Sequence, residues 1–211
     1  MSDFPRKLLG KPAAIYAHCM DEVKFRFEHT ARIVKSFDDL EGHGNRWLAL
    51  EAVALQYRKI IELVAFASIA ANEEQYARLR SDFSKDWNAR RIFKSLAIVN
   101  PNFYPKPISG LIAPANPGEH ETIDEYDDGF LSLDDAIDVY ERCGAVLHAE
   151  NRLGAFQDPN DSFAYFASRI ELFRKLLSDF WVHLESDEHR YIVQLHLGSE
   201  KRVEVFAAII G

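Results

Sequence analysis

Apolar residues recur at three- and four-residue steps over most of this chain, which is the spacing of amphipathic α-helices. The pattern predicts a long helix over residues 12–41 and a second over 46–71, separated by the glycines of "EGHGN" at 41–45. A third helical region covers about 73–98. Because the second helix ends in the very apolar run "IIELVAFASIAA", we expect it to lie at the centre of the fold.

The helical pattern stops at residue 100, and a proline-rich, acidic connector is expected over 100–131. "NPNFYPKPISGLIAPANPG" is rich in proline, which lacks a backbone donor and restricts φ, so this part is predicted to be loop, extended or polyproline II. Ser132 is suited to cap a helix, which is expected to run to about residue 153. After the turn "QDPNDS", a last long helix is expected over about 160–185.

The C-terminal segment changes its period. "HRYIVQLHLGSEKRVEVFAAII" alternates apolar and polar residues on both sides of "GSEK", which is typical of a β-hairpin. An isolated hairpin is only marginally stable in water, so it should pack on the helices. The expected fold is mainly α: a bundle of about five helices over 1–186, including the connector at 100–131, with a C-terminal β-hairpin over 187–211 packed on it.

Composition narrows the functional classes. The chain has 211 residues, 47% of them hydrophobic, which is enough for one sizeable core. A net charge of -8 disfavours indiscriminate binding to nucleic acid or anionic membranes but permits a local basic cleft. Two distant cysteines, no signal-peptide features and no long apolar run lead us to expect a cytoplasmic protein without a membrane partner. The histidines and cysteines show no metal-ligand spacing, so neither metal nor cofactor is expected.

The stretch "YERCGAVLHAEN", residues 140–151, carries the most specific candidate chemistry. Arg142 and His148 project about 120° apart on a helix. Gly144 lies four residues before His148 on the same side, and a helix-interior glycine costs about 1 kcal/mol relative to alanine; one explanation is the close approach of another backbone or a ligand beside His148. A purely structural interpretation stays open: His148 bonds to a neighbouring helix, Gly144 relieves a helix crossing, and Arg142 pairs with Asp138.

Arg142-x5-His148, late in a helical bundle, resembles the Arg-x4-6-His signature of the HEPN superfamily (higher eukaryotes and prokaryotes nucleotide-binding domains). Many members are metal-independent endoribonucleases of toxin–antitoxin, phage-defence and CRISPR systems. They typically act as homodimers whose two motifs face one composite cleft. The resemblance covers about residues 12–186 and implies that Arg142 holds phosphate while His148 serves in acid–base cleavage of RNA. Most active members have a polar residue after the arginine, where this chain has Cys143.

This chemistry needs no metal. RNA supplies its own nucleophile, the 2′-OH; histidine suits proton transfer near neutral pH, and arginine matches a phosphate bidentately. The alternative is a non-catalytic, HEPN-like interaction or regulatory protein that binds a protein partner. The enzyme predicts that Arg142 and His148 are exposed in a shared cleft with the charge of Arg58 or of the Lys85 region nearby, whereas the interaction protein predicts a buried, hydrogen-bonded His148.

Further polar residues are expected to contact substrate: Arg58, Glu62, Asn151, Arg90 and Arg91. The first two are spaced for a helix salt bridge, which is the structural alternative for them. The last two belong to a basic segment, 78–94, in which Trp87 adds a ring for base stacking. The alternative is a solvated basic face balanced by the acidic segment at 119–141.

Overall fold

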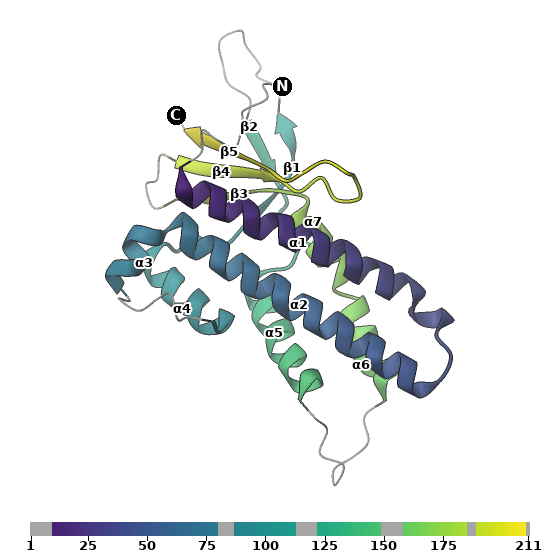
Figure 1. The fold of residues 1–211 in the computed structure, drawn as a ribbon. Helices are drawn as coiled ribbons and strands as arrows, with labels where there is room; N and C mark the ends of the chain where they lie inside the picture. The colour runs from purple at the N-terminus through teal and green to yellow at the C-terminus, as the bar shows by residue number, and fades with distance from the viewer. Residues whose placement is uncertain (1–9, 80–86, 113–121, 149–157, 185–188, 210–211) are drawn as a thin grey trace.

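The structure, a computed structural model, describes residues 10–79, 87–112, 122–148, 158–184 and 189–209. Two long antiparallel helices, α1 (Lys11–Ser36) and α2 (His43–Ala71), lie side by side, joined through the short 3-10 helix η2 (Phe37–Asp39). The other helices pack mainly around α2, and a β-sheet lies beside α1 (Figure 1). The prediction of a mainly α-helical fold is confirmed.

The sequence explains why α2 is central. Its buried residues fall on every side of the helix, and it contacts α1, α4, α5 and α6. The helix α1, by contrast, buries one stripe, which includes Tyr16, Met20, Val23 and Phe27. A helix that is apolar all round is stable only when neighbours cover every face, so the predicted central position is confirmed.

Shorter helices complete the bundle: α3 (Glu73–Leu79), α4 (Ala89–Val99), α5 (Leu133–Leu147), α6 (Pro159–Ala167) and α7 (Ile170–Leu177). The helix α5 begins at Ser132, whose hydroxyl accepts from the backbone N–H of Asp135 while the Asp135 carboxylate accepts from the Ser132 N–H. This reciprocal pair satisfies two N-terminal donors, so the predicted cap is confirmed.

The sheet is larger than the expected hairpin. Its five antiparallel strands lie in the order β2-β1-β3-β4-β5, with bounds β1 (Lys106–Ile112), β2 (Thr122–Glu125), β3 (Asp179–His183), β4 (His189–Gln194) and β5 (Glu204–Ile209). The expected hairpin is β4 with β5. The connector at 100–131, expected to be loop, extended or polyproline II, contains the strands β1 and β2, which pair into the sheet, and the expected helix over 160–185 is replaced by α6, α7 and β3.

These differences have local causes. In β3, Phe180, Trp181 and Val182 are all buried, and Phe180 and Val182 belong to the main core. A strand buried on both faces lacks the alternation of apolar and polar residues, so no period-two signal marks it in the sequence. In β1, Pro107 lacks a donor, and pairing with β3 is confined to Lys106 and Pro107.

Hydrogen bonds from a buried lysine of α1 hold the connection between β4 and β5 against that helix. The ammonium of the buried Lys24 donates to the carbonyl oxygens of His196, Ser199 and Lys201 at 2.7, 2.8 and 2.7 Å. Glu28, one helical turn along, accepts from the backbone N–H of Gly198 at 2.9 Å. Side chains from β3, β4 and β5 also join the core that α1 and α2 form. The division of the chain at residue 186 stays a prediction.

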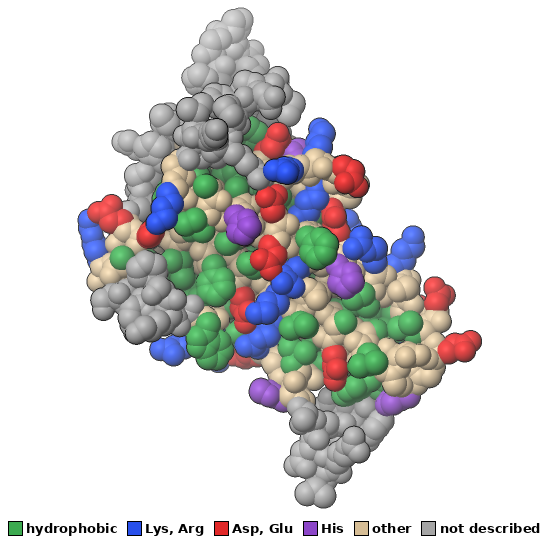
Figure 2. Space-filling view, in the orientation of Figure 1, with side chains coloured by type: hydrophobic (Ala, Val, Ile, Leu, Met, Phe, Trp, Pro, Cys, Tyr) green, Lys and Arg blue, Asp and Glu red, His purple; other side chains and the backbone are tan. Residues whose placement is uncertain are grey.

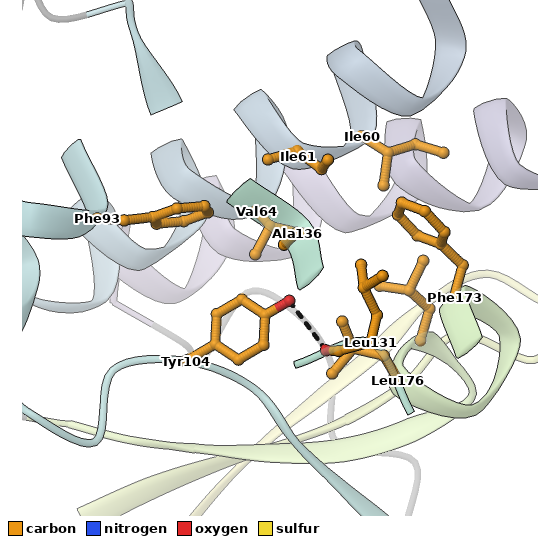
Figure 3. Close-up of a pocket in the computed structure, with 10 residues that line it drawn as sticks. Ile60, Ile61, Val64, Phe93, Tyr104, Leu131, Ala136, Phe173 and Leu176 are labelled. Carbon is orange, nitrogen blue, oxygen red and sulfur yellow. Dashed lines mark hydrogen bonds between the residues drawn. The ribbon is translucent and has the colours of Figure 1, made fainter. Parts of the chain in front are cut away.

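A small cavity of about 10 Å³ lies where α2, α4, α5 and α7 meet (Figure 3). Apolar side chains such as Ile61 and Phe173 surround it, and the Tyr104 hydroxyl at its edge donates to the Leu131 carbonyl at 3.2 Å. Space for about one water with no free polar partner makes this a packing defect, not a ligand site. In the described ranges, no helix has the length and apolar character to cross a membrane.

Candidate functional site on helix α5

The helix α5 carries the motif and packs against α2 through one face. Ala136, Val139, Tyr140 and Cys143 are buried, whereas Arg142 is exposed toward α6. The structure therefore divides the polar residues of this region into two groups on different sides of α5. One surrounds Arg142 and the other surrounds Arg58 of α2.

Arg142 is held by two neighbours. Its Nε donates to Asp138 Oδ1 and Oδ2 at 3.1 and 3.0 Å, and its guanidinium carbon lies 4.3 Å from the centroid of the Tyr165 ring on α6. The Tyr165 hydroxyl donates to the same carboxylate, Oδ2, at 2.6 Å. The predicted alternative pair of Arg142 with Asp138 is confirmed. The Arg142 side chain is 56% exposed, and its terminal nitrogens carry no hydrogen bond within the described part of the chain.

The charge states of this cluster follow from its contacts. The hydrogen bond from Tyr165 lowers the pKa of Asp138, and the hydrogen bond and charge of Arg142 lower it further. Burial and the bond to Asp138 raise the pKa of Tyr165 to about 12. At neutral pH the cluster is thus a neutral phenol and an ionised carboxylate that together orient one guanidinium.

His148 lies at the end of the helix and is exposed. The helix, expected to reach about residue 153, ends at Leu147; His148 follows as the extended C-cap residue, with its N–H bonded to the Gly144 carbonyl at 3.2 Å. The alternative of a buried His148 bonded to another helix is therefore wrong. Asn151, expected one turn further along, lies outside the described residues.

Cys143 does not replace a polar site residue in space. It is completely buried against α2, and burial raises the pKa of its thiol to about 12. The position after the motif arginine thus belongs to the core in this fold, and the thiol stays protonated at neutral pH.

Arg58 and Glu62 form a partly buried network on the other side of α5. Arg58 Nε lies 3.2 Å from Glu62 Oε1, and Lys59 Nζ lies 3.0 Å from Glu62 Oε2. Arg58 Nη2 donates to the Tyr140 hydroxyl at 2.8 Å, and that hydroxyl donates to Glu62 Oε1 at 3.2 Å. The salt-bridge alternative is confirmed for Arg58 and Glu62. Because Glu62 is buried, three partners compensate its lost hydration.

The same network explains Gly144. A Cβ added there would lie 3.3 Å from Arg58 Nη1, tighter than ordinary van der Waals contact. The group close to Gly144 is thus a side chain of the protein, not the backbone or ligand that was one explanation for this glycine. Arg58 contacts the Tyr140–Gly144 face, about 160° around the helix from Arg142 by the residue spacing. The two arginines consequently do not share one site within a single chain.

The basic segment is only partly free. Arg90 pairs with Glu141 of α5, and Arg78 pairs with Glu74. Arg91 is exposed at the first turn of α4; its backbone N–H bonds to the side chain of Asn88, and its guanidinium has no partner in the described ranges. Figure 2 shows charged side chains of both signs in a band across the middle of the face, over α2.

Sequence reasoning missed two residues beside Arg142. Tyr165 on α6 and Arg169 between α6 and α7 come from a different segment, and no spacing relates them to α5. The Arg169 guanidinium carbon lies 4.6 Å from the centroid of the same Tyr165 ring that Arg142 covers. The three come together because α5 and α6 both pack against α2.

Among the residues that the structure describes, no group of three or more His, Cys, Asp or Glu side chains is arranged to hold a metal ion. Comparisons of the chain with protein-family models, with curated proteins and with solved structures gave no match. The HEPN resemblance therefore stays a proposal that rests on the Arg142-x5-His148 motif.

Proposed function

We propose that the protein is a metal-independent endoribonuclease, HEPN-like in its chemistry, that acts through Arg142 and His148. The observation that supports this most is the exposure of both side chains, Arg142 on α5 and His148 at its C-cap, with the orientation of Arg142 held by Asp138 and Tyr165 and its terminal nitrogens without a partner among the described residues. A guanidinium oriented before binding loses less freedom on taking up a phosphate. A role in a defence or toxin–antitoxin system belongs to the same proposal.

The proposed reaction uses the 2′-OH of RNA. A neutral histidine accepts the 2′-OH proton as O2′ forms a bond to the adjacent phosphorus. A protonated histidine gives a proton to O5′ as the P–O5′ bond breaks, leaving a 2′,3′-cyclic phosphate and a 5′-hydroxyl end. Arginine neutralises the charge that develops on the phosphorane oxygens.

One chain by itself separates the two motif residues. Six residues of helix span about 9 Å along the axis, and the side chains project about 120° apart. A single α5 therefore does not direct Arg142 and His148 at the same phosphate. Two copies of the chain with their motifs facing one cleft would supply the arginine and both histidines, so the proposal includes a homodimer.

The test is cleavage of a mixed panel of labelled RNAs in excess EDTA. Wild type is compared with His148→Ala and with His18→Ala, which removes an exposed histidine from α1. We expect His148→Ala to lower the rate by about 10²–10⁴-fold while His18→Ala has no effect. Equal cleavage by the two variants, both folded by circular dichroism, would refute the role of His148.

A non-catalytic regulatory protein is the second candidate. Two observations favour it. Arg142 Nε is bonded to Asp138, and the buried Cys143 stands where most active members of the HEPN superfamily have a polar residue. No cleavage by wild type across the panel, together with co-purification of a specific protein partner that is lost on substituting exposed residues, would support this second function.

A further inference from the structure

We infer that Arg142 and Arg169 form a two-arginine phosphate site on the ring of Tyr165, and that it binds the phosphates of the RNA strand. This inference rests on the proposed function and adds to it a second phosphate-binding residue and a positioning residue. Arg169 belongs to the turn between α6 and α7, outside the motif helix.

The geometry begins with Tyr165. The guanidinium carbons of Arg142 and Arg169 lie 4.3 and 4.6 Å from the centroid of its ring. Both distances are within the range of cation–π contacts. Because each cation lies within 5 Å of one centroid, the two guanidinium carbons lie less than about 9 Å apart. That upper limit permits two adjacent phosphates of an RNA strand to be bound, one by each guanidinium.

Two like charges held this close need a counter-ion. Asp138 is the one carboxylate within bonding distance of Arg142 among the described residues, and the Tyr165 hydroxyl also bonds to it. The charges of both arginines lower the pKa of Asp138, so one carboxylate serves two cations and a net charge of +1 remains on the three groups. Arg169 Nε is buried and has no hydrogen-bond partner within the described residues.

The orientation of Arg142 also favours an incoming anion. Of the guanidinium nitrogens of Arg142, only Nε bonds to Asp138, and among the described residues the two terminal nitrogens have no partner and can form two parallel hydrogen bonds to a phosphate. Tyr165 acts as the positioning residue for both cations. It lies against them with its ring and fixes the carboxylate with its hydroxyl.

Binding is measured by fluorescence anisotropy with a labelled, fully 2′-O-methylated RNA oligonucleotide, which lacks the nucleophile and is not cleaved. The variants are Arg142→Met and Arg169→Met. The matched control is Arg174→Met on α7, which removes an exposed arginine that also lies over an aromatic ring, that of Phe27. All three change the net charge equally.

We expect Arg142→Met and Arg169→Met each to weaken binding roughly tenfold or more relative to Arg174→Met. Each should also reduce the slope of log K against log salt by about 0.7, the value for one phosphate contact to a single strand, while the control leaves the slope unchanged. Arg169→Lys should recover part of the salt slope but not the full affinity, because lysine lacks the two-pronged geometry.

Tyr165→Leu tests the positioning role. It should weaken binding about fivefold in the wild-type background, but have no further effect when both arginines are already methionine, since a positioning residue acts only through them. An equal effect in both backgrounds would overturn that role.

The outcomes separate the two proposals. If Arg169→Met binds the RNA as tightly as the control Arg174→Met does, the two-arginine site is overturned. The proposed nuclease still stands in that case if Arg142→Met weakens binding. No binding by wild type also overturns the site, whereas the EDTA cleavage assay alone then decides the proposed function. Loss of affinity in both variants with intact RNA in the cleavage assay supports the site and refutes the nuclease.

Discussion

Lys24→Met removes the ammonium group that ties the β4–β5 connection to α1. Methionine keeps an unbranched apolar stem of similar length, so the perturbation is close to the deletion of one charge and its three hydrogen bonds. In the native protein, Lys24 is only 8% exposed and its Nζ donates to three backbone carbonyl oxygens at 2.7–2.8 Å. Glu28 lies 3.8 Å from the same nitrogen.

The magnitude follows from opposing terms. Hydrogen bonds to charged groups contribute about 1.5–3 kcal/mol each, which for three bonds gives an upper limit of about 9 kcal/mol. Desolvation of the buried ammonium costs several kcal/mol, and methionine avoids that cost. The carbonyls of the exposed Ser199 and Lys201 regain water when the lysine is gone. We therefore expect Lys24→Met to lower the free energy of unfolding by about 2–3 kcal/mol.

Urea denaturation measures this value, with Lys35→Met as the control because Lys35 is an exposed lysine of the same helix. The control should stay within about 0.5 kcal/mol of wild type. Native-state hydrogen exchange should also show faster exchange at Gly198 and Ser199 in Lys24→Met, since the connection opens locally. A midpoint equal to that of the control, with unchanged exchange, would refute the reasoning.

Three further predictions concern α5 and the thiols. Gly144→Ala should stabilise the protein by about 1 kcal/mol in an Arg58→Ala background, which is the helix-propensity gain, and by less in wild type, because there the added Cβ lies 3.3 Å from Arg58 Nη1. Urea titrations of the four variants measure this coupling, and equal effects in the two backgrounds would contradict it. Burial raises the pKa of Cys19 to about 11 and that of Cys143 to about 12. A thiol reagent at pH 8 should therefore react slowly with the native protein and rapidly with both thiols in denaturant. Fast reaction with the native protein would show that the thiols are accessible. Because the pKa of Asp138 is lowered in the folded protein, its ionised form adds stability above the unfolded pKa of about 4, and this stability is lost as pH falls through the folded pKa. The small stability advantage of wild type over Asp138→Asn should therefore vanish in acid. Melting curves at pH 3–7 measure it, and a difference that does not change with pH would show that the charge is irrelevant.

The helical part of the fold could be predicted because its signals are local. The three-and-four spacing of α1, the apolar character of α2 and the Ser132 cap of α5 each lie within one stretch of sequence, and hydrogen bonds inside a helix join near neighbours. The β4–β5 hairpin was predictable for the same reason. The ion pairs Arg142–Asp138 and Arg58–Glu62 followed from helix periodicity alone.

The rest depends on contacts between distant segments. The strand β3 forms because β4 offers hydrogen bonds and the core accepts Phe180 and Val182, although the preceding residues favour a longer helix. Gly144 needed a close neighbour, but only the packing of α2 on α5 makes that neighbour Arg58. Likewise Tyr165 and Arg169 join Arg142 because α5 and α6 both pack against α2. By itself the sequence determined which segments are helical and which residues carry chemistry, whereas the tertiary structure decided which of them meet, because side chains far apart in sequence come together only when their helices pack.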